Sequence, residues 1–129
     1  MKADMTKILV IDDDAHDREL LTAVLEERGY AVMLADNGGA GLMSCHRGTP
    51  DAVVLDLDMP GIDGRSLLGQ LRILHPTLPV VIFSGRSPEE VEEEILNQGA
   101  TAFIQKAFSL DQLGSALQEV LPSPIQTGN

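Results

Sequence analysis

The sequence predicts an α/β domain built on an open, doubly wound, five-stranded parallel sheet. Short runs of Val, Ile and Leu alternate along the 129 residues with segments in which apolar residues recur at helical spacing. Three of the five runs are apolar almost throughout, which predicts burial on both faces and a parallel sheet covered by helices on each side. The order is therefore (βα)5. Right-handed crossovers leave few possible orders of the strands across the sheet. With the strands numbered along the chain, we expect the spatial order 2-1-3-4-5.

Each predicted strand is followed by a segment with one apolar face. The expected strands are Ile8–Ile11, Ala31–Ala35, Ala52–Leu55, Val80–Phe83 and Ala102–Gln105. Helices are expected around Leu20 to Leu25, Gly38–His46, Leu67 to Leu74, Val91 to Ile95 and Leu110 to Val120. The second of these has the weakest pattern because it contains three glycines. Helix starts are indicated by the capping residues Asp14, Ser87 and Ser109, and helix ends by Gly29, Gly48 and Gly99.

Composition limits the classes of function that the chain can have. We expect one domain over residues 1–121, followed at 122–129 by a polar tail or the start of a linker. With 20 Asp and Glu against 9 Lys and Arg, the net charge of −11 argues against direct binding to nucleic acid. No apolar stretch approaches the ~20 residues that span a membrane. The single cysteine, Cys45, cannot form an internal disulfide, so the chain is expected to be cytoplasmic.

Charged side chains are expected to meet at one edge of this sheet. Asp12–Asp14 follow the first strand, Asp56 and Asp58 follow the third, and Lys106, the only lysine after residue 7, follows the fifth. Ligands of a doubly wound sheet bind at the carboxyl ends of the strands where the strand order reverses, here between the first and third strands. Packed carboxylates repel one another unless a cation neutralises them, and oxygen ligands suit Mg²⁺. The pattern predicts a site for a metal and a phosphate.

Four motifs, in order, resemble the receiver domain of bacterial two-component response regulators, and more narrowly its chemotaxis-regulator-like members. The resemblance runs from about Lys7 to Leu121. Its motifs are Ile8 to Asp13, Asp51 to Gly64, Val81 to Gly85 and Phe103 to Phe108, the second being the most specific. The resemblance implies a flavodoxin-like fold. It also implies a signalling phosphoprotein that catalyses only its own phosphorylation and dephosphorylation, and is not otherwise an enzyme.

By that resemblance, Asp56 takes a phosphoryl group from the phosphohistidine of a histidine kinase or a histidine phosphotransfer protein. Asp13, Asp56 and the backbone carbonyl of Asp58 would bind Mg²⁺, or alternatively Mn²⁺, and Asp12 would act through a bound water. Lys106 would contact the phosphoryl oxygens. This assignment agrees with the chemistry, because phosphoryl transfer needs positioning and charge neutralisation more than covalent help.

The resemblance also implies a switch and a timer. Ser84 would donate a hydrogen bond to the phosphoryl group and move toward it, while Phe103 would turn inward and alter the face formed by the fourth helix, fifth strand and fifth helix. An output partner, or an effector domain that the sequence does not identify, would read that face, and a phosphorylation-dependent homodimer is one form of output. Asp58 and Arg86 flank the expected path of the attacking water. We predict that they pair and prolong the phosphorylated state.

Two alternatives compete with this assignment. A degenerate receiver would act only as an interaction module, but the complete set of Asp, Ser and Lys argues against it. A haloacid-dehalogenase-type phosphatase would use Asp56 and Asp58. That motif normally closes the first strand, however, and Pro60 stands where Thr or Val is usual.

One position departs from the receiver pattern. Ala107 follows Lys106, whereas the family usually has a proline there with a cis bond before it. A cis bond before alanine costs ~3 kcal/mol, against under ~1 kcal/mol before proline. We therefore predict a trans bond between Lys106 and Ala107.

Overall fold

Five strands form one parallel sheet. The computed structural model describes residues 4–59, 61, 63–106 and 109–126. The sheet has the spatial order β3-β2-β4-β5-β6 with every neighbouring pair parallel, which is the predicted order 2-1-3-4-5. The strands are β2 (Lys7–Ile11), β3 (Ala31–Ala35), β4 (Ala52–Leu55), β5 (Val80–Ser84) and β6 (Ala102–Gln105). Their bounds agree with the predicted ones to within one residue.

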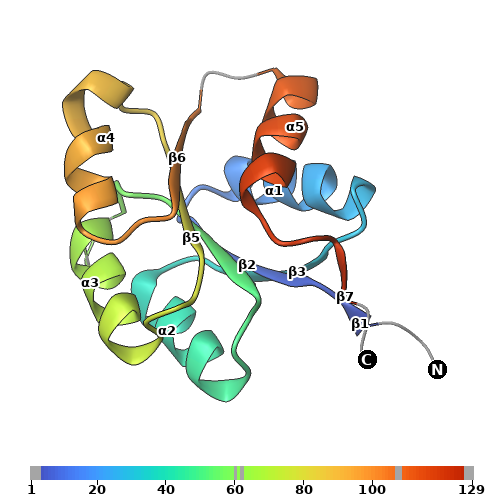
Figure 1. Ribbon diagram of the computed structural model, residues 1–129, viewed down its shortest axis with the longest axis horizontal. Coiled ribbons are helices and arrows are strands. Elements are labelled where there is room, and N and C mark those ends of the chain that lie inside the picture. The colour runs from blue at the N-terminus through green and yellow to red at the C-terminus, as the bar shows by residue number, and fades with distance from the viewer. Residues whose placement is uncertain (1–3, 60, 62, 107–108, 127–129) are drawn as a thin grey trace.

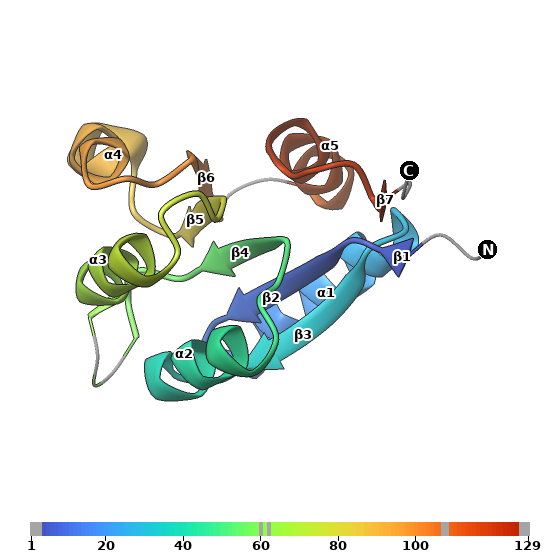
Figure 2. The ribbon, with the colours of Figure 1, turned by 60° about the horizontal axis from the view of Figure 1, so that its bottom comes forward.

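Five helices connect the strands and cover both faces of the sheet. They are α1 (Ala15–Glu27), α2 (Gly38–Arg47), α3 (Gly64–Leu74), α4 (Pro88–Asn97) and α5 (Leu110–Val120). Figure 1 shows α1 and α5 on one side of the sheet and α2, α3 and α4 on the other, and Figure 2 shows the same two groups from a second direction. The prediction of a doubly wound (βα)5 domain is confirmed, including the helix α2 with its three glycines.

Two apolar layers, one on each face of the sheet, form the core. Successive strand residues point to opposite faces. Ile8 and Val10 of β2 therefore pack with α1 and α5, while Leu9 and Ile11 pack in the layer beneath α2, α3 and α4. All four side chains are fully buried, which explains why the strand sequence lacks polar alternation. Burying such a side chain contributes ~1.5–3 kcal/mol, so the layers hold the strand ends in a fixed arrangement.

The helix starts follow from capping residues. Asp14 accepts hydrogen bonds from two backbone N–H groups in the first turn of α1, as its predicted role requires. Ser109 and Gln112 form a reciprocal capping box at the start of α5. Ser87 occupies the cap position of α4, but its hydroxyl contacts the carboxylate of Glu90 at 3.1 Å instead of a backbone N–H. The predicted cap is thus correct in position at all three helices and in hydrogen bonding at two.

Two of the three predicted glycine stops have the backbone that the prediction requires. Gly29 and Gly99 have φ values of 94° and 106°, in the left-handed region that favours glycine. The prediction for Gly48 was wrong, because its φ of −169° is ordinary extended backbone. The chain leaves α2 directly in an extended conformation and needs no left-handed turn there.

The two ends of the described chain pair at the amino ends of the strands. β1 (Asp4–Met5) lies antiparallel to β7 (Ile125–Gln126). The backbone N–H of Thr6 donates to the carbonyl of Pro124 at 3.0 Å, and the Tyr30 hydroxyl donates to the carbonyl of Pro122 at 2.8 Å. The sequence did not predict this pairing, since strands of two residues are too short to show a pattern. No helix in the described ranges is long and apolar enough to cross a bilayer.

Candidate functional site

Three carboxylates meet at the carboxyl ends of β2 and β4. Asp12, Asp13 and Asp56 each offer a carboxylate oxygen, and these oxygens all lie within 4.8 Å of one another. The arrangement follows from strand register: Ile11 of β2 lies opposite Leu55 of β4. The residues that follow these two strands therefore leave the sheet side by side. The fold thus brings together carboxylates that stand more than 40 residues apart in the sequence.

Two of these carboxylates are buried. Asp12 is 1% exposed and Asp56 is 5% exposed, whereas Asp13 is open to solvent. Each buried carboxylate accepts a hydrogen bond from the backbone N–H two residues further along, at 2.9 Å for Asp12 and 3.1 Å for Asp56. Burial raises the pKa of Asp56 to about 6 against the opposing effects of that N–H and of Lys106, and it also raises the pKa of Asp12. Such a pair binds a proton or a cation more readily than exposed carboxylates do.

Lys106 supplies the positive charge of the cluster. Its Nζ lies 3.3 Å from Asp12 Oδ2 and 3.4 Å from Asp56 Oδ2. A third carboxylate, that of Asp17, is closer still, with its Oδ2 at 2.7 Å. Burial by itself lowers the pKa of Lys106, but the hydrogen bond to Asp17 and the charges of Asp56 and Asp12 raise it overall. The side chain is therefore a permanent ammonium ion, with the ring centroid of Phe83 5.4 Å away.

Among the carboxylates that contact Lys106, Asp17 is the one that the sequence did not predict. It is the third residue of α1, where an acidic side chain is already explained by the positive end of the helix dipole. Its position five residues after Asp12 is the feature of the sequence that could have predicted this contact. A residue in the first helical turn after Asp12–Asp14 lies above the strand end, within reach of any cation held there.

Ser84 ends β5, between the strands that carry Asp56 and Lys106. It is fully buried, and its Oγ accepts a hydrogen bond from the backbone N–H of Arg86 at 3.1 Å. The carbonyl of Ser84 accepts a hydrogen bond from the backbone N–H of Lys106 at 2.8 Å. The Ser84 hydroxyl and the Lys106 ammonium group thus belong to neighbouring strand ends that a backbone hydrogen bond joins.

The predicted contact between Asp58 and Arg86 is present. Arg86 Nε lies 3.0 Å and 3.1 Å from the two carboxylate oxygens of Asp58, and Nη2 lies 2.8 Å from Oδ1. The hydrogen bond and the charge of Asp58 raise the pKa of Arg86. Both side chains are nearly half exposed, at 43% for Arg86 and 46% for Asp58. Since water screens exposed ion pairs, this one adds little to stability.

Phe103 lies within β6, three residues before Lys106. Its side chain is half-buried and packs against the apolar layer beneath α2, α3 and α4. This is one orientation of the side chain, so its rotation on phosphorylation stays a prediction. Ala107 lies outside the described residues, and so does the predicted trans bond between Lys106 and Ala107.

Gly64 lets α3 start close to the backbone of Asp56 and Leu57. It is the first residue of α3, and its N–H donates to the carbonyl of Leu57 at 3.2 Å. A Cβ at this position would lie 2.6 Å from Leu57 Cα and 2.8 Å from the carbonyl oxygen of Asp56. Only glycine lets the helix start so close to this backbone. The close approach holds the residues around Asp56 against α3.

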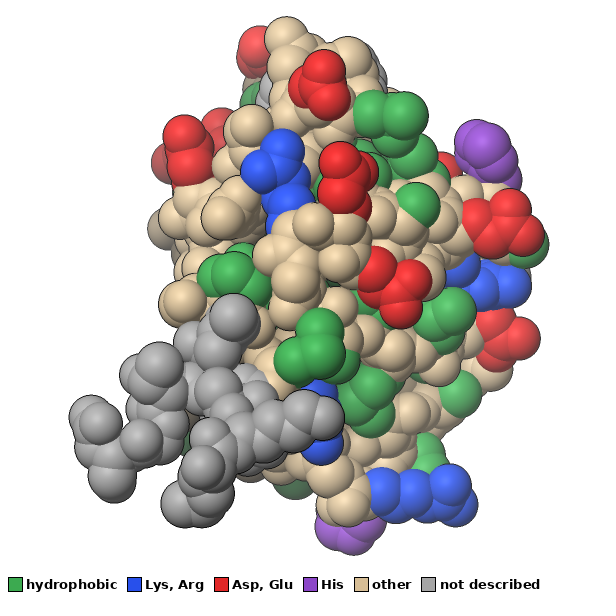
Figure 3. All heavy atoms as spheres, turned by 90° about the vertical axis from the view of Figure 1, so that its right-hand side faces the viewer, with side chains coloured by type: hydrophobic (Ala, Val, Ile, Leu, Met, Phe, Trp, Pro, Cys, Tyr) green, Lys and Arg blue, Asp and Glu red, His purple; other side chains and the backbone are tan. Residues whose placement is uncertain are grey.

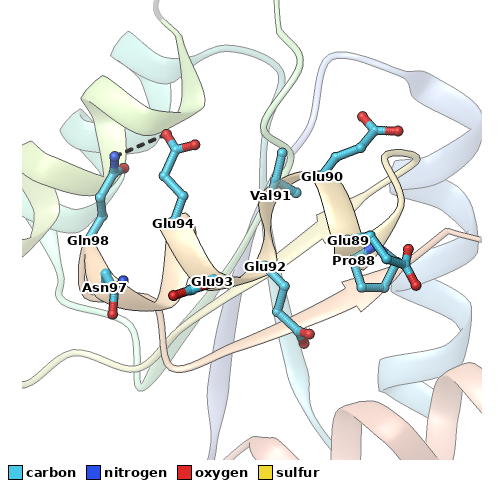
Figure 4. A pocket seen from close by; sticks show the side chains of 9 residues that line it. All are labelled: Pro88, Glu89, Glu90, Val91, Glu92, Glu93, Glu94, Asn97 and Gln98. Carbon is cyan, nitrogen blue, oxygen red and sulfur yellow. Dashed lines mark hydrogen bonds between the residues drawn. The ribbon is translucent and has the colours of Figure 1, made fainter.

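Among the residues that the structure describes, no other acidic side chains form a comparable cluster. A shallow hollow along α4 is lined by five glutamates that point in several directions, as Figure 4 shows: Glu89, Glu90, Glu92, Glu93 and Glu94. Glu94 pairs with Arg65 at 2.8 Å. On the face that carries α1 and α5, Figure 3 shows acidic side chains scattered among basic and apolar ones. The glutamates of α4 are therefore interpreted as a solvated helix face.

Comparison with known proteins identifies the class to which this fold and cluster belong. The family described as response regulator receiver domain matches residues 8–118. The chain therefore belongs to the family of response regulator receiver domains, the signalling modules of two-component systems. The haloacid-dehalogenase-type alternative is left without support.

Its relatives include longer proteins. Response regulator MprA of Mycobacterium leprae (strain TN) is 37% identical over 117 residues, which cover 89% of this chain and 50% of MprA. The DNA-binding transcriptional regulator NtrC of Escherichia coli (strain K12) is 32% identical over 114 residues, or 88% of this chain and 24% of NtrC. The chain thus spans half of the length of MprA and about a quarter of NtrC.

Solved structures of separate receivers have the same fold. Chemotaxis protein CheY4 of Vibrio cholerae superposes with a TM-score of 0.84 at 27% identity, covering 92% of this chain and 100% of that one. The receiver domain of NtrX from Brucella abortus superposes with a TM-score of 0.82 at 33% identity, covering 88% and 97%. The flavodoxin-like fold expected from the sequence is confirmed.

Proposed function

We propose that this domain is the phosphoacceptor of a two-component phosphorelay and that Asp56 takes the phosphoryl group. The donor is the phosphohistidine of a histidine kinase or of a histidine phosphotransfer protein, in the cytoplasm. One observation carries the proposal. The buried carboxylate of Asp56 lies close to Asp12, Asp13 and the partly buried ammonium group of Lys106, at the carboxyl end of β4 in a receiver fold.

The donor set suits Mg²⁺, and Mn²⁺ would accept the same ligands. Asp13 and Asp56 offer carboxylate oxygens, and the backbone carbonyl of Asp58 is the third ligand that we assign. By resemblance to the receiver family, we assign Asp12, the more deeply buried of the two buried carboxylates, a role through a bound water. When bound, the metal ion would neutralise the carboxylates and the phosphoryl oxygens together.

The transfer itself needs an ionised carboxylate. An oxygen of Asp56 forms a bond to phosphorus while the bond from phosphorus to the donor imidazole breaks, and the leaving nitrogen keeps the electron pair and takes up a proton. A pKa of about 6 leaves Asp56 mostly ionised at neutral pH. Lys106 then balances charge on the phosphoryl oxygens, and the hydroxyl of Ser84 donates a hydrogen bond to one of them.

The output is a change on the surface formed by α4, β6 and α5. Ser84 now accepts a hydrogen bond from the backbone of Arg86, so a move toward the phosphoryl group would draw on the loop before α4. Phe103 packs partly exposed on β6, where an inward turn would alter the same surface. A partner or an effector domain would read the change, and a phosphorylation-dependent homodimer is one form of it. The local charge of the phosphoryl group biases this two-state element.

The pair of Asp58 and Arg86 sets the lifetime of the phosphorylated state. It joins the segments that follow β4 and β5, and by resemblance to the receiver family we expect these to flank the path of the attacking water. A closed pair partly shields the acyl phosphate. Opening of the pair would therefore precede hydrolysis.

A small phosphodonor such as acetyl phosphate tests the assignment without a kinase. With Mg²⁺, intact mass should show one added phosphate on the wild-type chain and none on Asp56→Asn or with a chelator present. Asp51→Asn, at the opposite end of the same strand, is the matched control and should react like the wild type. Modification of Asp56→Asn at the wild-type rate refutes the role of Asp56. A wild-type chain that takes up no phosphate would instead support the alternative of a degenerate receiver acting as an interaction module.

A further inference from the structure

We infer that Asp17 is a resting-state restraint on Lys106, which competes with the phosphoryl oxygens for this lysine and so lowers the fraction of the domain that is phosphorylated. The inference deepens the proposed function and rests on it. It concerns a residue outside the carboxylate cluster that we assign to the metal ion.

The first observation is that three carboxylates already hold Lys106, which donates hydrogen bonds to Asp17 and Asp12 and forms an ion pair with Asp56. An ammonium group has three N–H donors. Three carboxylate oxygens surround Nζ, with Asp17 at 2.7 Å and those of Asp12 and Asp56 at 3.3 Å and 3.4 Å. The shortest contact is thus made to the carboxylate that has no other role at the site. Both partners are largely shielded from water, at 21% exposed for Lys106 and 19% for Asp17.

The second observation is that hydrogen bonds to Asp12 and Asp14 hold the backbone around Asp17 in place. Its backbone N–H donates to the carboxylate of Asp14 at 3.2 Å. The next residue, Arg18, donates from Nη1 to the carbonyl of Asp12 at 2.8 Å. The first turn of α1 is thereby tied to the end of β2. When Lys106 shifts, Asp17 cannot follow it far.

Competition follows from these two observations. A phosphoryl group on Asp56 brings a charge of roughly −1.5 to −2 and three strong acceptor oxygens. Lys106 reaches them by turning its ammonium group away from Asp17, and its flexible four-carbon stem permits the move. The contact with Asp17 is the one that can be given up without disturbing the metal ligands. Breaking this contact costs free energy, because a hydrogen bond to an ionised carboxylate is stronger than one to a neutral acceptor. That cost opposes phosphorylation.

Replacing Asp17 by Asn keeps the shape and leaves a neutral acceptor, so the restraint weakens. The probe is beryllium fluoride, a tetrahedral phosphoryl analogue, titrated at saturating Mg²⁺ and followed by calorimetry. The affinity of Asp17→Asn should rise by on the order of tenfold, since a hydrogen bond to a charged group is exchanged for a neutral one. Glu19→Gln removes the same charge from an exposed position on the same helix. That control should stay within about twofold of the wild type, as expected for an exposed charge.

A double-mutant cycle with Lys106→Ala separates the restraint from a general effect of charge. If Asp17 acts through Lys106, the effect of Asp17→Asn disappears when the lysine is absent. Should that background bind too weakly for calorimetry, the phosphorylated fraction measured by intact mass closes the same cycle.

Two outcomes overturn the inference. One is an Asp17→Asn chain that binds no more tightly than the wild type, and the other is a gain that persists without Lys106. A wild-type chain that takes up neither beryllium fluoride nor phosphate would instead refute the proposed function itself.

Discussion

Neutralising Asp56 should make the metal-free protein more stable, although it removes the proposed phosphoacceptor. Burial raises the pKa of this carboxyl to about 6, whereas the unfolded chain has a value near ~3.9. The folded state therefore binds this proton more tightly than the unfolded state does. Below pH ~4 the Asp56 carboxyl is protonated in both states and does not lower the free energy of unfolding. As the pH rises from about 4 to about 6, ionisation of the buried carboxyl lowers the free energy of unfolding, and above pH ~6 this loss of stability is complete.

The magnitude follows from the shift. About two pKa units at ~1.4 kcal/mol each amount to ~3 kcal/mol of lost stability at neutral pH. The attraction of Lys106 is already contained in the shift, and the lysine keeps two other carboxylate partners in Asp56→Asn. The variant should thus be more stable than the wild type by ~3 kcal/mol at pH 7 to 8, or roughly 10 °C in Tm for a domain of this size. At pH 4 the difference should fall to nearly zero.

Urea unfolding followed by far-ultraviolet circular dichroism measures this difference, since the chain has no Trp and a single Tyr. A chelator keeps the site free of metal, and the series runs from pH 4 to pH 8. Asp36→Asn is the matched control: it removes an exposed carboxylate at the same edge of the sheet. It should change the free energy of unfolding by less than ~0.5 kcal/mol. An Asp56→Asn variant no more stable than the wild type at pH 8 would show that burying the Asp56 charge does not destabilise the fold.

Three further predictions concern the metal, the lifetime of the phosphoryl group and the loop after β4. Mg²⁺ at one hundred times its Kd should stabilise the wild type by ~2.7 kcal/mol, and Asp13→Asn should lose most of this gain in thermal melts; an equal gain would exclude Asp13 as a ligand. Arg86→Ala should hydrolyse its acyl phosphate several-fold faster in a phosphate-release time course, with no further acceleration on adding Asp58→Ala; unchanged half-lives would mean that the pair shields nothing. Gly64→Ala should destabilise the fold by at least ~2 kcal/mol through its clash with the backbone. Gly69→Ala, in open space on the same helix, should stabilise it by up to ~1 kcal/mol, so equal effects of the two changes would contradict the account of this loop.

The sequence predicted the strands well because burial on both faces leaves a nearly continuous apolar run in the three central strands, β2, β4 and β5. β4, for example, reads Ala-Val-Val-Leu and is buried at every position. Parallel strands of one sheet then place their carboxyl ends together. The approach of Asp12 and Asp56 was therefore predictable from strand ends alone. Lys106 was predictable in the same way, as the residue that directly follows β6.

What the sequence did not predict depends on details that strand patterns do not record. The contact between Asp17 and Lys106 joins residues 89 apart, and it depends on how the first turn of α1 is rotated over the strand end. The pairing of β1 with β7 rests on two residues in each strand and on backbone hydrogen bonds, which any sequence can make. Gly48 shows the converse case. Its identity suggested a left-handed turn, but the chain leaves α2 extended.

The proposed function requires that one side chain, that of Asp56, carries the phosphoryl group. Borohydride reduces an aspartyl phosphate to homoserine, and peptide mass spectrometry then locates the converted residue. After reaction with a phosphodonor and Mg²⁺, we expect homoserine at position 56 and unchanged aspartate at Asp12, Asp13 and Asp58. Conversion at any of these three positions, with Asp56 intact, would contradict it.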